Sequence, residues 1–281
     1  MRKILITGGA GMLGHELKRA APADAEIHAL DRSQLDVTDH LAVKTVLRRL
    51  RPDQVIHAAA MTDVDACEHD RDRAFRVNGI GTQNVAAAAA DVQAELIYVS
   101  TDYVFDGSKR EPYLEHDLVH PQSVYGHSKL WGEATVRDLH ARFWIVRTQW
   151  VYGRHGRNFV DTIRRAARER PELKVVDDQT GCPTWALDLA RALYLILAQQ
   201  PPYGIYHCSS AGSCTWFHFA RTILELVGSK TPVNPWTSQE LNRPAKRPTY
   251  SVLRNFCLEM TIGDPMRNWQ DAVKEYLGES R

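Results

Sequence analysis

The sequence lacks an excess of charge of either sign and contains no long apolar run. Its 281 residues include 35 Lys and Arg against 34 Asp and Glu, which gives a formal net charge of +1. Without a basic excess, we expect neither nucleic acid nor an anionic membrane surface as a partner. No apolar run approaches the length of a membrane span, and the first residues enter a predicted strand at once. We therefore expect no membrane association and a cytoplasmic location.

The residue spacings typical of disulfide frameworks and of metal sites are also absent. The cysteines are scattered, odd in number and contain no Cys-x-x-Cys pair, so we expect reduced packing residues. The twelve histidines show no His-Glu-x-x-His spacing, so no catalytic metal is predicted. The five cysteines are Cys67, Cys182, Cys208, Cys214 and Cys257.

A glycine-rich turn follows the first predicted strand. Lys3–Thr7 is a short apolar run, and Gly8, Gly11 and Gly14 come next, at the start of a helical pattern. In dinucleotide-binding turns the first glycine permits a tight turn, the second lets a pyrophosphate approach, and the third lets helix and strand pack closely. The spacing here is Gly-x-x-Gly-x-x-Gly, whereas the usual pattern is Gly-x-Gly-x-x-Gly. The free N–H groups of the helix N-terminus favour phosphate, so we predict a dinucleotide site.

An acidic residue stands at the distance that this motif requires. Asp31 follows the strand-like run Glu26–Leu30. An acid at this position accepts hydrogen bonds from the ribose hydroxyls of NAD and would repel a 2′-phosphate. Arg32 could offset that repulsion, so the sequence predicts NADH or NADPH, with NADH slightly favoured. The alternative is that Asp31 is an ordinary turn residue at the end of a strand.

Strand and helix signals alternate along the first half of the chain. Strands that alternate with helices imply a parallel, doubly wound sheet, and ligands bind such sheets at the carboxyl ends of the strands. We therefore predict an α/β fold with a Rossmann-like doubly wound parallel sheet. The predicted strands are Lys3–Thr7, Glu26–Asp31, Gln54–Ala58, Glu95–Ser100 and Phe143–Arg147, and the predicted helices are Gly11–Ala21, His40–Arg49, Asp70–Ala90 and Ser123–Leu139.

The alternation of strand and helix signals weakens after Val151, which predicts a smaller C-terminal lobe interwoven with the first. We expect residues 1–150 to form a dinucleotide-binding Rossmann domain. Residues 151–281 should form mainly a substrate-binding lobe, partly interleaved with the first, with substrate between them. A basic, proline-rich loop is expected over Thr231–Tyr250. The other predicted elements are helices at Asn158–Glu169, Trp185–Gln199, Thr215–Val227 and Trp269–Leu277, and strands at Leu173–Val176 and Gly204–Cys208.

The chemistry is indicated by Tyr125 and Lys129, which stand four residues apart and follow Thr101 at the end of a predicted strand. On a helix this spacing places both side chains on one face. An ammonium beside a phenol lowers the pKa of the phenol, which can then pass a proton to a carbonyl oxygen near neutral pH. Thr101 could donate to the same oxygen. The alternatives are an exposed helix face for the pair and strand-end capping for the threonine.

Taken together, these motifs resemble the extended short-chain dehydrogenase/reductases and, among them, the dTDP-4-dehydrorhamnose reductases. The resemblance covers nearly the whole chain. It rests on the glycine turn, Tyr125-x-x-x-Lys129 and further marks in both halves. Those marks are Ala58–Asp65, Ser100–Phe105, Arg147–Gly153, Gly156–Phe159, Asp178-Gln179-x-Gly181-x-Pro183-Thr184 and Arg247-Pro248-x-Tyr250-Ser251.

This resemblance implies reduction of the C4 ketone of dTDP-6-deoxy-L-lyxo-4-hexulose to dTDP-L-rhamnose, with Thr101, Tyr125 and Lys129 as catalytic residues. It implies substrate contacts from Thr101, Trp150, Asn158 and Arg247. Trp150 would give the sugar or the base a flat apolar face and Arg247 would bind diphosphate, although core packing and a solvated basic loop are the alternatives. The cofactor contacts that it implies, with the glycines Gly8 and Gly14, are Gly11, Met12, Leu13, Asp31, Asp36, Val37, Ala60, Met61, Thr62, Tyr125 and Lys129.

The chain departs from the family at one position, and two family properties stay open. Gln149 stands in Thr148-Gln149-Trp150 where the family often has serine, so Gln149 either alters the substrate fit or faces the core. Some members bind magnesium at a dimer interface. We find no acidic cluster for this ion, so the metal, and the choice between monomer and homodimer, stay open.

Two other functions remain compatible with the sequence. Related sugar-nucleotide epimerases and dehydratases hold NAD tightly and need an additional acid or base near the sugar, and Asp102 beside Thr101 could supply one. The regulatory subunit of methionine adenosyltransferase has a similar fold and binds NADP without turnover. The joint presence of Thr101, Tyr125 and Lys129 favours catalysis. Which nucleotide and 4-ketosugar are preferred among close relatives is left open.

Overall fold

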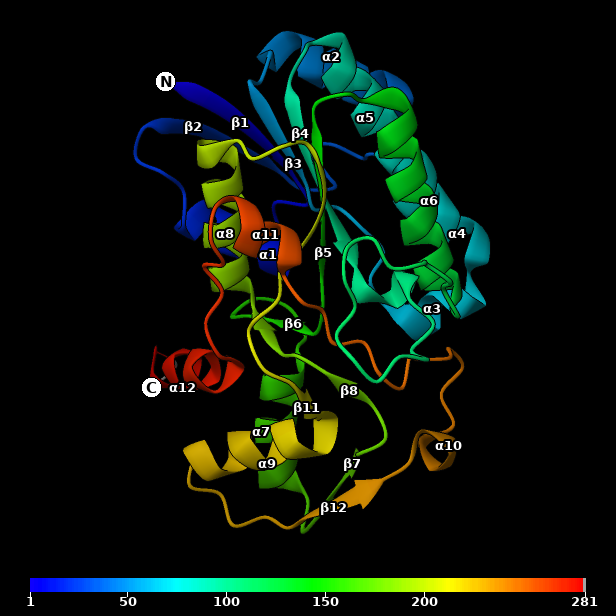
Figure 1. Cartoon of the computed structure of the whole chain (residues 1–281), viewed down its shortest axis with the longest axis vertical. Helices are drawn as coiled ribbons and strands as arrows, with labels where there is room; N and C mark the ends of the chain where they lie inside the picture. The colour runs from blue at the N-terminus through cyan, green and yellow to red at the C-terminus, as the bar shows by residue number, and fades with distance from the viewer. Residues whose placement is uncertain (280–281) are drawn as a thin grey trace.

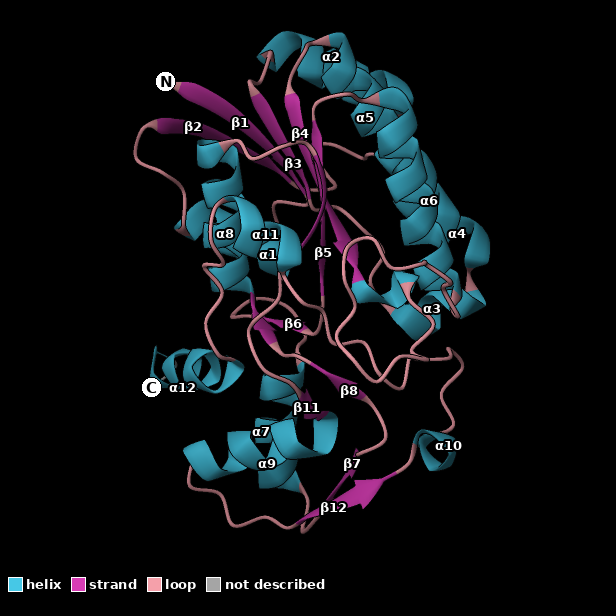
Figure 2. Ribbon diagram, viewed as in Figure 1, coloured by secondary structure: helices cyan, strands magenta, loops and turns pink. Residues whose placement is uncertain are grey.

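A computed structural model describes residues 1–279 of the chain, and its centre is a twisted parallel sheet (Figures 1 and 2). Within these residues the sheet has six strands in the order β10-β5-β4-β3-β1-β2, and every neighbouring pair is parallel. The strands are β1 (Arg2–Thr7), β2 (Ala25–Leu30), β3 (Gln54–His57), β4 (Glu95–Thr101), β5 (Phe143–Thr148) and β10 (Gly204–His207).

The five strands predicted in the first half are confirmed to within two residues at each end. A parallel sheet covered on both faces reads as continuous apolar runs, because both sets of side chains are buried. Leu5 and Ile6, for example, point to opposite faces and are both fully buried. The strand predicted at Gly204–Cys208 is confirmed as β10, which joins the central sheet beside β5. The second half of the chain therefore completes the sheet of the first.

Helices cover both faces of this sheet (Figure 1). Ile4 and Ile6 pack against α1, α8 and α11 on one face, and Leu5 packs against α2, α5 and α6 on the other. The first set is α1 (Met12–Arg19), α8 (Ala186–Gln199) and α11 (Phe256–Thr261), and the second is α2 (His40–Leu50), α5 (Gly81–Asp91) and α6 (Val124–Leu139).

The helix predicted at Asp70–Ala90 forms, but it contains an irregular turn. It consists of α4 (Arg71–Phe75), the π-helical η1 (Arg76–Ile80) and α5, and α3 (Val64–His69) precedes it. A π turn adds a residue to the helix and often marks a functional site. Here it carries Asn78, whose side chain accepts a hydrogen bond from Met61 N and donates to Met61 O and to Ser128 Oγ. Asn78 thus fixes the loop after β3.

A smaller lobe lies below the carboxyl ends of the strands in Figure 1. Its core is rich in aromatic side chains, among them Trp185, Phe219 and Trp269. The prediction of a loop over Thr231–Tyr250 was partly wrong, because this segment contains the strand β12 (Val233–Trp236) and the helix α10 (Ser238–Leu241). The strand β12 pairs in parallel with β7 (Leu173–Val176). Pro235 is tolerated in β12, since a two-stranded sheet has only edge strands. The elements are β6 (Val151–Tyr152), α7 (Phe159–Glu169), β7 (Leu173–Val176), β8 (Thr180–Gly181), β9 (Thr184–Trp185), β11 (Cys214–Thr215), α9 (Trp216–Leu226), β12 (Val233–Trp236), α10 (Ser238–Leu241) and α12 (Trp269–Glu279).

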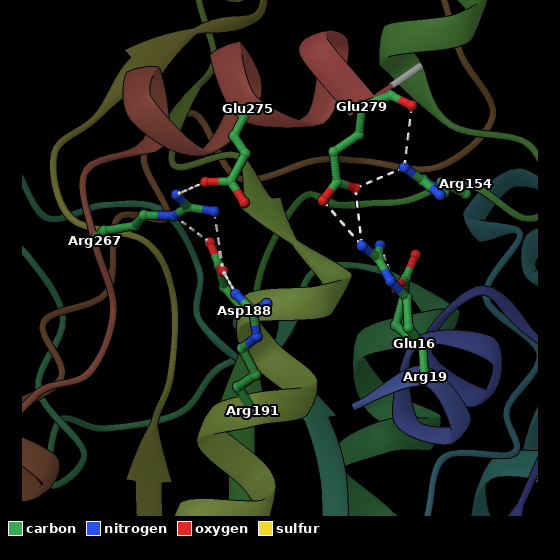
Figure 3. Close-up of polar contacts among 8 residues, drawn as sticks. All are labelled: Glu16, Arg19, Arg154, Asp188, Arg191, Arg267, Glu275 and Glu279. Carbon is green, nitrogen blue, oxygen red and sulfur yellow. Dashed lines mark hydrogen bonds and ion pairs between the residues drawn. The ribbon is translucent and has the colours of Figure 1, made fainter. Parts of the chain in front are cut away.

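Ion pairs connect α12 to the first lobe (Figure 3). Glu279 accepts hydrogen bonds from Arg19 of α1 at 2.9 Å and from Arg154, after β6, at 2.6 Å. Arg267, just before α12, donates to Asp188 of α8 at 2.8 Å. Several of these groups are partly exposed, so each pair contributes little stability.

Candidate active site

Two adjoining cavities lie at the carboxyl ends of the central strands. The larger, about 430 Å³, is lined by residues of both lobes, and the smaller, about 300 Å³, lies beside the end of β2. Both are lined by Gly8, Gly11, Ala58 and Ala60, so they form one elongated site. This is the position at which doubly wound sheets bind ligands, and its extended shape suits a dinucleotide with a second molecule beside it.

The glycine turn occupies the junction of the two cavities. Gly8 has φ +74, and a Cβ there would lie 2.9 Å from the backbone of Ala59. A Cβ on Gly14 would lie 2.4 Å from the carbonyl oxygen of Gly8. Gly11 is the N-cap of α1 and offers no side chain to its free N–H groups. These N–H groups can therefore bind a pyrophosphate, as the sequence predicted.

Asp31 lies in the smaller cavity with two other predicted cofactor residues, Asp36 and Val37. The Asp31 carboxylate accepts hydrogen bonds from Ser33 and from Gln34 N, which hold its pKa below the usual value. It is therefore ionised at neutral pH and can accept from ribose hydroxyls. Arg32 pairs with Asp36 at 3.5 Å and is largely exposed. Met61 lines this cavity, and Met12, Leu13 and Thr62 line the larger one.

The structure brings Thr101, Tyr125 and Lys129 together in the larger cavity. Tyr125 stands in the first turn of α6, which Ser123 caps, and Lys129 follows one turn later. Thr101 is the last residue of β4. The Tyr125 hydroxyl lies close enough to Thr101 for the threonine to lower the pKa of the phenol in part. The arrangement places two hydroxyl groups side by side where the carboxyl end of β4 meets the cavity.

The expected effect of Lys129 on Tyr125 is not found in this structure. Burial raises the pKa of Tyr125 well above its ordinary value, although the contact with Thr101 lowers it in part. The reason is the direction of Lys129, whose Nζ donates to Val99 O at 2.8 Å and lies 4.1 Å from the centre of the Tyr98 ring. Burial also lowers the pKa of Lys129 to about 7, against the opposing effect of Glu133.

A buried polar cluster that the sequence did not reveal supports this helix. Glu133 follows Lys129 by one further turn and accepts hydrogen bonds from Arg147 Nε at 2.9 Å and Nη2 at 2.7 Å. It also accepts from Ser100 Oγ at 2.6 Å. The two side chains are 1% and 3% exposed, so the ion pair is fully removed from water. It joins α6 to β4 and β5 directly behind Lys129.

Aromatic residues form the wall that the second lobe contributes. Trp150 stacks on Trp216 with ring centres 3.5 Å apart and an interplanar angle of 11°. Both residues line the larger cavity. Trp150 has φ +46, and a Cβ on Gly181 would lie 2.5 Å from its indole. One face of Trp150 is thus covered by Trp216, which sequence reasoning missed because no local pattern distinguishes the first residue of α9.

Two predicted substrate residues do not line either cavity. Asn158 caps α7, accepts from Asp161 N and donates to Gly153 O at 2.7 Å, so its side chain holds the preceding loop. Arg247 pairs with Asp65 at 3.0 Å and is 18% exposed. The cavity is instead lined by Arg157, an exposed residue directly before Asn158.

Gln149 connects the end of β5 to the second lobe. Its Oε1 accepts a hydrogen bond from Cys182 N at 3.0 Å, and the residue is 2% exposed. It also borders the larger cavity. The side chain is therefore largely internal, and its Nε2 is buried without a hydrogen-bond partner among residues 1–279.

Two other kinds of feature are absent from the described part of the chain. Among residues 1–279, no three His, Cys, Asp or Glu side chains are arranged to hold a metal ion. In the same part of the chain, no helix is both long and apolar enough to cross a membrane.

Comparison with known proteins decides the family. The family model described as RmlD substrate binding domain matches residues 1–281. The chain belongs to this family. A solved dTDP-4-dehydrorhamnose reductase from Clostridium acetobutylicum is 46% identical, with a TM-score of 0.96 and 99% of each chain covered.

Two further relatives concern the cofactor and the sugar. A dTDP-4-dehydrorhamnose reductase from Bacillus anthracis, solved in complex with NADP, is 39% identical with a TM-score of 0.96, over 99% of this chain and 100% of that chain. A dTDP-4-keto-6-deoxy-D-glucose reductase from Streptomyces niveus is 39% identical over 274 residues, 96% of this chain and 95% of that protein. The chain is thus similar to reductases named for different 4-ketosugars.

Proposed function

We propose that this protein reduces the C4 ketone of dTDP-6-deoxy-L-lyxo-4-hexulose to dTDP-L-rhamnose with NADH or NADPH. The observation that carries the proposal is that Thr101, Tyr125 and Lys129 line one cavity that continues to the glycine turn. The 46% identical reductase supports the choice of substrate. The product belongs to deoxysugar and cell-surface polysaccharide biosynthesis.

The dinucleotide would be held by the first half of the chain. The N–H groups at the start of α1 would bind its pyrophosphate, and Asp31 would accept from the adenosine ribose. When bound, a reduced nicotinamide supplies hydride to the carbonyl carbon. We propose residues 1–150 as the dinucleotide-binding domain and residues 151–281 as mainly the substrate lobe, from which α8 and β10 return to the central sheet.

Three side chains of this protein would stabilise or neutralise the negative charge that develops on the ketone oxygen. Tyr125 would give its proton to that oxygen, and Thr101 would donate a hydrogen bond that orients it. The raised pKa of Tyr125 keeps its hydroxyl group protonated at neutral pH. Lys129 donates to Val99 O in this structure, so its ammonium would have to turn toward Tyr125 to stabilise the tyrosinate that remains after transfer.

The second lobe would recognise the nucleotide sugar. The stacked pair of Trp150 and Trp216 offers an apolar wall for a sugar or a base. Arg157 borders the same cavity and could pair with the diphosphate, as could Arg247 after leaving Asp65. The cytoplasmic location, and the choice between monomer and homodimer, stay predictions.

The test is turnover with a defined substrate. We would follow the absorbance of NADH and NADPH with dTDP-6-deoxy-L-lyxo-4-hexulose and identify the product by its NMR couplings at C4. Formation of dTDP-L-rhamnose supports the proposal. Turnover of another 4-ketosugar nucleotide alone would reassign the substrate. Purified protein with bound, non-exchanging NAD would favour an epimerase or dehydratase, and tight dinucleotide binding without any turnover would favour a regulatory subunit.

A further inference from the structure

Asp102 is a buried acid in the candidate active site. It begins the short helix η2 (Asp102–Val104), directly after Thr101 ends β4, and it lines the larger cavity with Tyr125. Only 1% of the residue is exposed. An acid at this depth is unusual, because burying an ionised carboxylate is costly unless a cation or several hydrogen bonds compensate it.

The surroundings of Asp102 suit a neutral carboxyl group. Its Oδ1 lies 3.0 Å from Thr101 Oγ1, and its Oδ2 is buried without a hydrogen-bond partner among residues 1–279. Burial raises the pKa of Asp102 to about 7. The hydroxyl groups of Ser251 and Thr101 and the backbone N–H groups of Asp102 and Tyr103 oppose this only in part. A neutral carboxyl leaves Oδ2 as an uncharged carbonyl oxygen, which costs far less to bury than one oxygen of a carboxylate.

The hydrogen-bonding capacity of Thr101 shows why the charge of Asp102 matters. A hydroxyl group has one proton to donate and two lone pairs that accept. Thr101 Oγ1 already accepts from Tyr103 N at 3.2 Å. If Asp102 is ionised, it can only accept, so Thr101 must turn its single proton to the carboxylate. If Asp102 is neutral, it can donate to the second lone pair, and the Thr101 proton remains for Tyr125 or a reacting oxygen.

We propose that Asp102 is a positioning residue that acts as a neutral acid: it donates to Thr101 and so frees the Thr101 proton for the substrate oxygen. This role rests on the proposed reductase function, in which Thr101 donates to the ketone. It adds an ionisation that switches the reaction off as the pH rises, through a group that need not touch substrate.

Other titratable groups around Asp102 must be separated from it in a test. Burial raises the pKa of both Tyr103 and Tyr125, so these stay neutral near pH 7, whereas the pKa of Lys129 is about 7. The ion pair of Arg247 and Asp65 lies beyond Tyr103 and keeps its charges in this range.

The variant Asp102→Asn isolates the effect, because its amide donates a hydrogen bond and does not titrate. We expect kcat of this variant at pH 6 within about threefold of wild type. From pH 7 upward, the ratio of variant to wild-type kcat should rise by about tenfold per pH unit, as the wild type loses its neutral fraction. Ionisation of Lys129 is common to both proteins and cancels in the ratio. Asp102→Ala, without a donor, should lose kcat at both ends of the range.

Two measurements report on Asp102 without turnover. The infrared difference spectrum between wild type and Asp102→Asn at pH 6 should contain the C=O band of a protonated carboxyl, and this band should vanish above pH 8. A group whose pKa is raised from 3.8 to about 7 on folding loses stability as the pH rises through that window. The melting temperature of Asp102→Asn relative to wild type should therefore increase between pH 4 and 7 and then stay level.

Several outcomes would overturn the proposal. These are a constant kcat ratio between pH 6 and 8.5, absence of the carboxyl band at pH 6, or a folded but inactive Asp102→Asn. If no ketosugar is turned over at all, the infrared and melting data still decide the charge of Asp102. That result would count against the proposed function alone.

Discussion

Replacing Glu133 with glutamine should destabilise the protein severely, although the two side chains have nearly the same shape. In the wild type, Glu133 accepts two hydrogen bonds from Arg147 and one from Ser100, at 2.6–2.9 Å. The glutamine keeps one accepting oxygen and turns an NH₂ group toward the guanidinium. Arg147 then remains buried with its charge unpaired.

The magnitude follows from the burial of the pair. Side chains that are 1% and 3% exposed receive almost no compensation from water, so breaking the pair should cost about 3–5 kcal/mol. At about 2–4 °C per kcal/mol for a chain of this size, the melting temperature should fall by roughly 6–20 °C. Urea denaturation at pH 7, followed by circular dichroism, measures the free energy directly.

A matched control is available on the surface. The pair Arg48 and Asp91 is 3.4 Å apart and has side chains 61% and 48% exposed. Asp91→Asn should cost about 0.5 kcal/mol or less, since exposed ion pairs contribute little. If the free energy of unfolding of Glu133→Gln lies within about 1 kcal/mol of the wild-type value, the buried ion pair does not stabilise the fold as we argue.

The same substitution should also change the pH dependence of the reaction. Glu133 raises the pKa of Lys129 against the effect of burial. Without that carboxylate the pKa of Lys129 falls below about 7, and a smaller fraction of Lys129 is charged at neutral pH. We expect the alkaline limb of the kcat profile to move to lower pH in Glu133→Gln, and not in the surface control.

Three further substitutions test the cofactor and substrate sites. Gly14→Ala places a Cβ 2.4 Å from Gly8 O and 2.8 Å from Gly9 Cα, which are backbone atoms. We therefore expect the free energy of unfolding, measured by urea denaturation, to fall by about 1–3 kcal/mol, and dinucleotide binding, measured by fluorescence titration, to weaken. Asp31→Ser removes the charge that repels a 2′-phosphate, so the ratio of kcat/KM for NADPH to that for NADH should rise by about tenfold, and an unchanged ratio would contradict the role of Asp31. Arg247→Ala should raise the substrate KM by about tenfold with a smaller change in kcat, and an unchanged KM would remove Arg247 from the site.

Local patterns were sufficient to predict most of the central sheet. The run Lys3–Thr7, followed by three glycines, has few other interpretations, because a buried parallel strand needs continuous apolar residues and the turn needs glycine. The π turn at η1 was missed because its residues fit a regular helical pattern, and only the contacts of Asn78 show the irregularity. β12 was missed because its partner β7 lies nearly sixty residues away in the chain.

In the candidate site, too, some residues could be placed from local patterns and others depend on tertiary contacts. Thr101, Tyr125 and Lys129 could be found because helix spacing and a strand end determine where they lie. The stacking of Trp150 on Trp216 joins residues from different elements, which no local pattern reveals. Asn158 was expected to contact substrate, yet its side chain caps α7, and the neighbouring Arg157 borders the cavity instead. The buried pair of Glu133 and Arg147 likewise depends on tertiary contacts.

The most direct test of the central claim compares the wild type with Tyr125→Phe. The variant removes one hydroxyl group and leaves the ring, so a fluorescence titration should still show binding of NADH and NADPH. With dTDP-6-deoxy-L-lyxo-4-hexulose, we predict turnover by the wild type and a loss of about 10²-fold or more in kcat for the variant. Full activity of Tyr125→Phe would contradict the assignment of Tyr125 as the proton donor.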